Sequence, residues 1–131
     1  MDQAIINENM KTLLHAQQGE LDAVLMYNKL AEVVSDTDAL VFKQLAAEEG
    51  QHASVFHNYT LTVLKPKKMK SILIPFLYKM LGRNRAYHLI ANGEYSAGKK
   101  YKTIVGTFSD VQSVLDDEFR HGDMVKALLN K

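Results

Sequence analysis

The residues of this chain best suited to do chemistry are glutamates and histidines that recur at fixed spacing. The pattern Glu-x-x-His occurs twice, as EGQH over residues 49–52 and as EFRH over residues 118–121. An earlier amphipathic stretch with a lone glutamate precedes each copy. The complete set of four carboxylates and two imidazoles is Glu20, Glu49, His52, Glu94, Glu118 and His121. A pair of metal ions held inside a four-helix bundle needs this set, in this order along the chain.

The six positions coincide with the apolar stripes of four amphipathic stretches. On the second stretch, steps of three and four residues lead from Phe42 and Leu45 through the Glu-x-x-His pair to Phe56. Four ionised glutamates in one core would repel each other and lose their hydration, which is costly without cations. No lysine or arginine shares these stripes, whereas two divalent cations would balance four carboxylates. Mixed carboxylate and imidazole ligation favours iron or manganese, with zinc as a competitor. The alternative is an interaction bundle whose buried acids pair with Lys99, Lys102 or Arg120.

Helical spacing of apolar residues predicts an all-α protein that forms one domain over residues 1–131. The expected helices cover about 5–34, 38–64, 84–105 and 110–129. Short connections make the first two helices antiparallel neighbours, and likewise the last two. The connection over about 65–83 holds both prolines and can run the length of a ~25-residue helix, about 37 Å. A long crossover after the second helix is the connectivity of a ferritin-like four-helix bundle.

This crossover begins with the basic segment KPKKMK and continues with the apolar segment SILIPFLYKML. We favour a short amphipathic helix that covers the end of the core or makes a dimer contact. Membrane contact through residues 71–81 is the weaker alternative, because the apolar run is short and Pro75 interrupts it.

Three further residues are candidates for contacts with the metal ligands. Tyr27 and Tyr101 each lie seven residues after a lone glutamate. Their hydroxyls could hydrogen-bond a ligand or relay electrons, although plain core tyrosines fit the pattern equally well. Gln17 lies one helical turn from Glu20 in the same stripe and is the third candidate.

Three acids and four glycines adjoin the predicted ligands. Glu48, Asp116 and Asp117 point about 100° or more away from the ligand stripes, so we expect them in solvent. Orientation of a ligand histidine is the alternative role for one of them. The glycines suggest close helix approach or local bulging at the site, because each costs about 1 kcal/mol in a helix. They are Gly19, Gly50, Gly93 and Gly122.

Composition excludes several other kinds of site. The chain has no cysteine, which excludes disulfides, iron–sulfur clusters and thiolate catalysis. A formal net charge of +1 gives no indication of nucleic-acid binding. The polar first residues lack the apolar region of a signal peptide, and no apolar run reaches the ~20 residues of a membrane span. We therefore expect a cytoplasmic protein.

The chain resembles the rubrerythrin group of ferritin-like di-iron proteins over nearly its whole length. The resemblance is carried by GELDAVLMYNKLAE, LAAEEGQHASVF, GEYSAGKKY and DDEFRHGDMV. It is closest to the short rubrerythrin-like domains associated with vacuolar-iron-transporter-type proteins. It implies two iron ions on the six residues above, bridged by Glu49 and Glu118, with Glu20 and Glu94 as terminal ligands. It also implies a homodimer.

Two departures from that family bear on the activity. Rubrerythrins carry a second glutamate three residues after the ligand of the third helix, where this chain has Ala97. They also usually carry a rubredoxin domain, which a chain without cysteine lacks. Electrons would therefore come from an external donor or from ferrous iron itself.

We expect a di-iron oxidoreductase that reduces hydrogen peroxide or dioxygen as ferrous iron is oxidised, in a peroxidase or ferroxidase role. One alternative is hydroxylation of a lipid-like substrate, by resemblance to demethoxyubiquinone hydroxylases and because of the apolar crossover. Another is a non-catalytic module that binds iron or delivers it to a partner.

Overall fold

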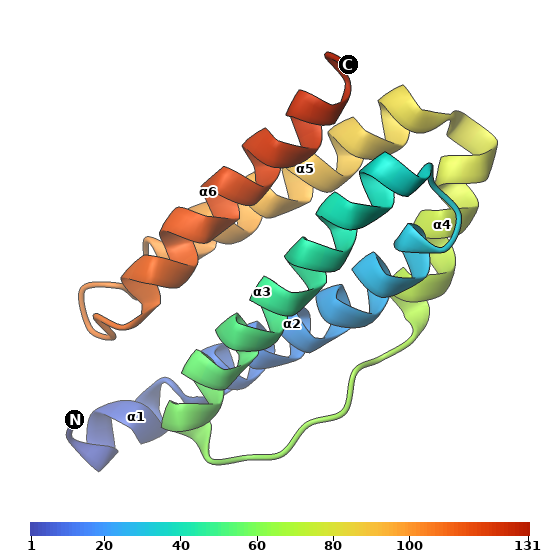
Figure 1. Ribbon diagram of the computed structural model, residues 1–131. Coiled ribbons are helices and arrows are strands. Elements are labelled where there is room, and N and C mark those ends of the chain that lie inside the picture. Colours follow the sequence, from blue (N-terminus) through green and yellow to red (C-terminus); the bar gives the residue numbers. More distant parts are fainter.

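The computed structural model describes residues 1–131 and contains only helices. The prediction of an all-α protein is therefore confirmed. The helices are α1 (Gln3–Glu8), α2 (Met10–Ala31), α3 (Asp36–Thr60), α4 (Met69–Leu81), α5 (Arg83–Tyr101) and α6 (Val111–Leu128). The four long helices α2, α3, α5 and α6 lie side by side (Figure 1). No helix combines the length and the apolar character needed to cross a membrane.

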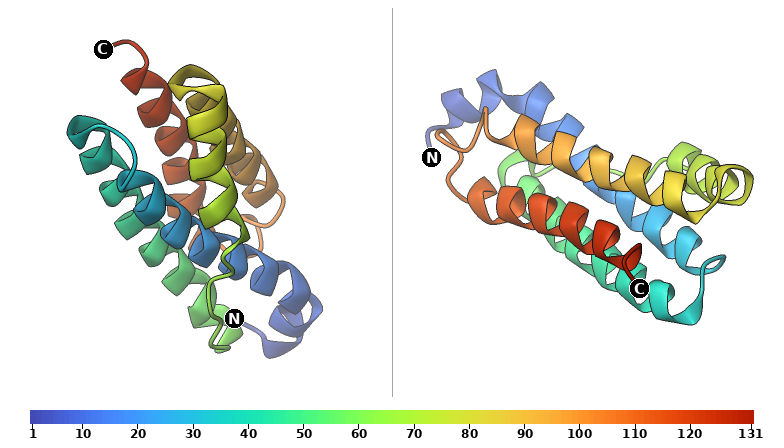
Figure 2. Two further views of the ribbon diagram at one scale, coloured as in Figure 1. Left: turned by 90° about the vertical axis from the view of Figure 1, so that its right-hand side faces the viewer. Right: turned by 90° about the horizontal axis from the view of Figure 1, so that it is seen from above.

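The chain runs as two antiparallel helix pairs joined by a long crossover. Residues 32–35 connect α2 to α3, and residues 102–110 connect α5 to α6. The segment 61–68 returns along the outside of the helices, so that α3 and α5 run in the same direction (Figure 1). Helix α4 follows this segment and packs against α2 and α5 (Figure 2). The two predicted Glu-x-x-His segments, on α3 and α6, consequently lie on neighbouring helices.

Local chemistry explains where the helices begin and end. Ser35 caps α3, because its Oγ accepts a hydrogen bond from the backbone N–H of Asp38 at 3.3 Å. The helix ends at Thr60 rather than near residue 64, because Leu61 has a left-handed backbone with φ of 53°. The first expected helix is divided at Asn9 into α1 and α2. The third expected helix, α5, ends at Tyr101 rather than near residue 105.

Two apolar clusters fill the space between the long helices. The first is centred on residues such as Leu30, Phe42 and Tyr87, and the second on residues such as Leu13, Phe56 and Phe108. On every long helix the predicted ligands lie between residues of one cluster and residues of the other. The ligand positions therefore form a polar layer in the middle of the protein, with an apolar layer on each side.

Candidate metal centre

All six predicted ligands converge in the polar layer between the two apolar clusters. Glu20 extends from α2, Glu94 from α5, and one Glu-x-x-His pair from each of α3 and α6. The most exposed of the six, Glu94, has only 6% of its surface accessible, and His121 has none. Ionisable side chains are rarely buried to this extent unless partners compensate their charge. The fold thus gathers four carboxylates and two imidazoles away from water.

The six side chains form two overlapping groups of four residues, each able to hold a metal ion. Within each group, one oxygen or nitrogen from every member lies within 4.8 Å of the others. One group contains Glu20, Glu49, His52 and Glu118, and the other contains Glu49, Glu94, Glu118 and His121. Glu49 and Glu118 belong to both groups. We call the two four-residue groups half-sites. The carboxylates of the two Glu-x-x-His segments are therefore shared by both half-sites.

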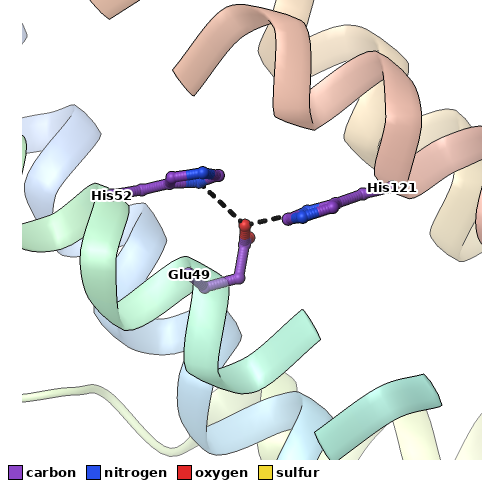
Figure 3. A group of neighbouring side chains, drawn as sticks. All are labelled: Glu49, His52 and His121. Carbon is purple, nitrogen blue, oxygen red and sulfur yellow. Dashed lines mark ion pairs between the residues drawn. The ribbon is translucent and has the colours of Figure 1, made fainter. Parts of the chain in front are cut away.

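Both imidazoles turn their Nδ1 atoms into the cluster (Figure 3). Nδ1 of His52 lies 3.0 Å from Glu118, 3.1 Å from Glu49 and 3.6 Å from Glu20. Nδ1 of His121 lies 3.1 Å from Glu49 and 3.5 Å from Glu94. Each histidine thus faces both shared glutamates, Glu49 and Glu118, together with the lone glutamate of its own half-site.

The outer nitrogens of the histidines bind acids of the opposite helix. Nε2 of His52 lies 2.8 Å from Asp117 on α6, and Nε2 of His121 lies 3.0 Å from Glu48 on α3. Arg120 donates hydrogen bonds to both of these acids. A carboxylate partner fixes Nε2 as the protonated nitrogen of a neutral imidazole, which leaves the Nδ1 lone pair free for a metal ion.

Glu48 and Asp117, which we expected in solvent, are therefore only partly exposed, and both take the alternative role of contacting a histidine. Both side chains do point away from the ligand stripe of their own helix. They point toward the neighbouring helix, however, and there each meets a histidine. A usable signal was present, because both ligand pairs are preceded by an acid, as EExxH at Glu48 and DExxH at Asp117. Asp116 is exposed as expected and accepts a hydrogen bond only from Gln112. Arg120 pairs with these outer acids and makes no ion pair with the buried glutamates.

The two tyrosines hydrogen-bond the lone glutamates in a crossed arrangement. The hydroxyl of Tyr27 on α2 donates to Glu94 on α5. The hydroxyl of Tyr101 on α5 donates to Glu20 on α2 at 2.9 Å. Burial, reinforced by the neighbouring carboxylates, raises the pKa of both phenols. They therefore stay protonated donors, and each leaves its glutamate one free oxygen that faces the cluster.

Gln17, the third expected partner of the ligands, is buried but has a different role. Its side-chain oxygen accepts a hydrogen bond from Thr60 at 2.5 Å, and its nitrogen donates to the backbone oxygen of Thr62 at 2.8 Å. These bonds attach the start of the crossover to α2. No hydrogen bond joins Gln17 to a predicted ligand, so its expected contact with the site is absent.

Only one of the four glycines beside the ligands marks a close helix approach. A methyl group on Gly122 would overlap the ring of Tyr95, which brings α5 and α6 together beside His121. The space around Gly19 and Gly93 is open, and Gly50 has only one ordinary contact. A second close approach occurs at Gly98, where the added carbon would lie 2.8 Å from the ring of Phe119. Gly98 is not adjacent to a predicted ligand in the chain, so the sequence pattern did not indicate this approach.

Mutual electrostatics decide which cluster members carry protons when no metal is bound. Burial, with repulsion from Glu49, raises the pKa of Glu20 to about 8, and burial raises that of Glu118 to about 12. Burial disfavours charged imidazoles, but the surrounding carboxylates outweigh it. They raise the pKa of His52 and bring that of His121 to about 10. Burial also opposes the charge on Glu49, but the two histidines, whose Nδ1 atoms lie 3.1 Å away, lower its pKa to about 2. Protons therefore substitute for cations in the metal-free cluster.

Each of the six residues presents one buried atom that makes no well-aligned hydrogen bond, although these atoms lie close to one another. They are Glu20 Oε2, Glu49 Oε1, His52 Nδ1, Glu94 Oε2, Glu118 Oε1 and His121 Nδ1. No other buried side-chain nitrogen or oxygen in the protein is unpartnered. An unpaired buried polar atom costs about 1–3 kcal/mol, so a ligand that engages all six atoms would stabilise the protein. Metal coordination by oxygen and imidazole nitrogen fits all six at once.

The fold and this cluster define an all-helical protein with buried glutamate and histidine side chains that can hold metal ions. No family model, curated protein or solved structure matches the chain.

Proposed function

We propose that the cluster holds two metal ions and that the protein is a di-iron carboxylate oxidoreductase. The six unpartnered atoms carry this proposal, since each belongs to one of the two half-sites and no other buried side chain has such an atom. One ion would be held by Glu20, Glu49, His52 and Glu118, and the other by Glu49, Glu94, Glu118 and His121. Glu49 and Glu118, which belong to both groups, would bridge them.

The donor set supports iron as the metal. Four carboxylates balance the charge of two divalent ions, and one imidazole in each half-site adds a donor softer than oxygen. Calcium and magnesium prefer ligation by oxygen alone. Manganese and zinc can use the same atoms, so we expect them as substitutes in vitro. Iron is the member of this group that supplies electrons readily to peroxide or dioxygen.

The proposed activity is reduction of hydrogen peroxide or dioxygen, in a peroxidase or ferroxidase role. Reduction of one hydrogen peroxide to two waters consumes two protons and two electrons, and a pair of ferrous ions supplies the electrons when bound. The protein would hold the two half-sites together through Glu49 and Glu118 and keep bulk water out with its two apolar layers. Return to the ferrous state requires an external electron donor or fresh ferrous iron.

We further propose that the fold is a ferritin-like four-helix bundle of the rubrerythrin-like group. The parallel direction of α3 and α5, which the long crossover produces, supports this assignment (Figure 1). The order of the ligands along the chain supports it as well. Ala97 stands where rubrerythrins carry an additional glutamate, so we expect no movement of an iron ion toward that side chain.

Metal analysis combined with rapid kinetics tests the proposal. The protein is loaded anaerobically with ferrous iron, and bound iron is counted per chain. The loaded protein is then mixed with hydrogen peroxide or with air-saturated buffer, and the growth of ferric absorbance is followed. We expect about two irons per chain and faster oxidation than ferrous iron shows in the same buffer. The faster oxidant distinguishes peroxidase from oxygen chemistry.

Variants identify the source of the signal. Glu49→Gln and Glu118→Gln should each lower the iron content and slow oxidation at least tenfold, whereas Glu8→Gln at an exposed site should match the wild type. Two bound irons without oxidation would instead support a non-catalytic iron-binding module. A wild-type protein that retains no stoichiometric metal would overturn the proposal.

A further inference from the structure

Helix α4 packs with one face and presents an apolar stripe to the outside with the other. Its inner face, with Ile74 and Tyr78, contacts the first apolar cluster. This contact agrees with the expected packing role of the helix. Its outer face carries large apolar side chains that remain accessible to solvent, for example Met69 at 77% and Phe76 at 55%. Each member of this outer stripe lies three or four residues from another member; the members are Met69, Ile72, Leu73, Phe76 and Met80.

The outer stripe lies within the most basic part of the sequence. Between Glu49 and Glu94 there is no acidic residue, but there are seven basic ones: Lys65, Lys67, Lys68, Lys70, Lys79, Arg83 and Arg85. The rest of the chain contains the other nine basic residues and all fifteen acidic residues. The net charge of the whole chain is close to zero, so it does not indicate the positive charge of this region. None of its five lysines forms an ion pair, whereas Arg83 is paired with Asp38.

The lysines lie where the side chains of an interfacial helix reach the lipid headgroups. At about 100° per residue, Lys70 and Lys79 fall on opposite borders of the outer stripe. Such side chains can place their methylene groups along apolar surface and their charges among phosphates. The remaining lysines precede the helix in the exposed segment 65–68.

We propose that α4 docks the protein on the surface of membranes that contain anionic lipids. The outer stripe would enter the headgroup region, and the lysines would contact the negatively charged headgroups. This inference rests on the crossover alone and does not depend on the metal centre. The helix lies in the plane of the surface and does not cross the membrane, in agreement with the absence of a spanning helix.

Charge argues against a second copy of the chain as the occupant of this face. In a twofold contact the same patch meets itself, so lysines would face lysines, and residues 50–93 contain no acid to pair them. Asp22 of α2 lies beside the segment, but it accepts a hydrogen bond from the backbone N–H of Lys67. Such like-charge contacts are costly, and lysine is depleted at protein interfaces. A surface of anionic lipid provides both an apolar layer and the missing negative charge.

Vesicle flotation tests the proposal with the full chain. Vesicles of phosphatidylcholine alone are compared with vesicles that also contain phosphatidylserine, at low and at high salt. We expect flotation with the anionic vesicles only, and a loss of at least fivefold at high salt because exposed charges are screened. The double variant Ile72→Ser/Phe76→Ser and the triple variant Lys67→Gln/Lys68→Gln/Lys70→Gln should each lose flotation at least fivefold.

Matched controls use exposed residues outside the crossover. Leu40→Ser/Leu89→Ser removes two exposed leucines, and Lys11→Gln/Lys99→Gln/Lys100→Gln removes three exposed lysines. Both controls should float like the wild type, and circular dichroism should show equal helix content for every variant. Equal losses in controls and crossover variants would overturn the proposal, as would a wild type that never floats. A dimer that Ile72→Ser/Phe76→Ser dissociates, without any vesicle binding, would assign the stripe to a second copy.

Discussion

At the scale of single residues, the outer acids determine how each histidine presents itself to the cluster. Asp117 holds Nε2 of His52 at 2.8 Å, and Glu48 holds Nε2 of His121 at 3.0 Å. The hydrogen bond sets the tautomer and also the plane of the ring. The ability of the cluster to bind metal should therefore depend on residues that do not themselves face it.

Asp117→Asn should weaken metal binding about 10- to 100-fold, the usual effect of losing the partner of a ligand histidine. An amide can present its NH₂ group to the ring and favour the wrong tautomer. Metal retention is measured by competition with a chelator of known affinity. Asp116→Asn is the matched control, since that neighbour is exposed and has no contact with a histidine. Equal affinities for the two variants would contradict the role assigned to Asp117.

Asp38 links the first turn of α3 to the first turns of α5. Its carboxylate accepts hydrogen bonds from Arg83 at 3.0 Å and from Tyr87 at 2.6 Å. Burial opposes its charge, but these bonds hold its pKa below the ordinary 3.8. A depressed pKa in the folded state stabilises the protein above pH 3.8. That stabilisation is lost as the pH falls through the folded-state pKa.

Asp38→Asn should consequently lower the free energy of unfolding by about 1–3 kcal/mol at pH 7. The difference between variant and wild type should shrink as the pH falls below 3.8. Urea unfolding at a series of pH values measures both effects. Asp36→Asn, an exposed position in the same helical turn, is the control. A difference that does not change with pH would show that packing, rather than charge, is the cause.

At the scale of helices, the spacing between α5 and α6 depends on two glycines. Tyr95 lies against Gly122 and donates a hydrogen bond to Asp123 at 2.6 Å, and Phe119 lies against Gly98. The two rings are stacked, with centroids 6.2 Å apart. This aromatic contact fixes α6, and with it one Glu-x-x-His pair, relative to the lone glutamate of α5.

Glycine-to-alanine substitutions should therefore have opposite signs at different sites. Gly19→Ala and Gly93→Ala meet open space and should each raise the free energy of unfolding by up to about 1 kcal/mol, through helix propensity. Gly122→Ala must displace the ring of Tyr95 and should lower it by about 1–2 kcal/mol despite that gain. Thermal and urea unfolding of the three variants measures the difference. A stabilising Gly122→Ala would show that the ring moves at little cost.

The apolar pattern of the sequence predicted the helices well where burial follows that pattern. It failed where the backbone conformation ends a helix or where a side chain contacts another helix. Residues 61–64 continue the apolar pattern of α3, yet Leu61 reverses the backbone, and Val63 is 84% exposed. All six cluster residues could be predicted, because buried acids on apolar stripes are conspicuous. Glu48 and Asp117 could not be assigned from one helix, because their partners lie on another.

At the scale of the whole molecule, the cluster would couple the proposed metal binding to protonation. In the metal-free protein at neutral pH, four groups hold protons because their pKa values are raised. They are His52, His121, Glu118 and Glu20. Coordination requires neutral imidazoles and ionised carboxylates, so bound metal must displace these protons.

Metal binding at pH 7 should therefore release several protons per chain, and affinity should fall as the pH is lowered. Calorimetric titration in buffers of different ionisation enthalpy gives the number of protons released. Zinc is a suitable probe because it involves no redox step. A titration with the same apparent enthalpy in every buffer would contradict the predicted proton occupancy.

The crossed hydrogen bonds make each half of the chain incomplete without the other. Tyr27 holds Glu94 while Tyr101 holds Glu20, and the outer acids likewise serve histidines of the opposite half. The segment 61–68 supplies no cluster residue and lies on the outside (Figure 1). In kinetic terms it is a tether. Beyond its hydrogen bonds to α2, it keeps the two halves of the cluster at a high effective concentration, on the order of millimolar for short linkers. A chain cut within 61–68 should then reassemble its cluster only at protein concentrations that replace this tether.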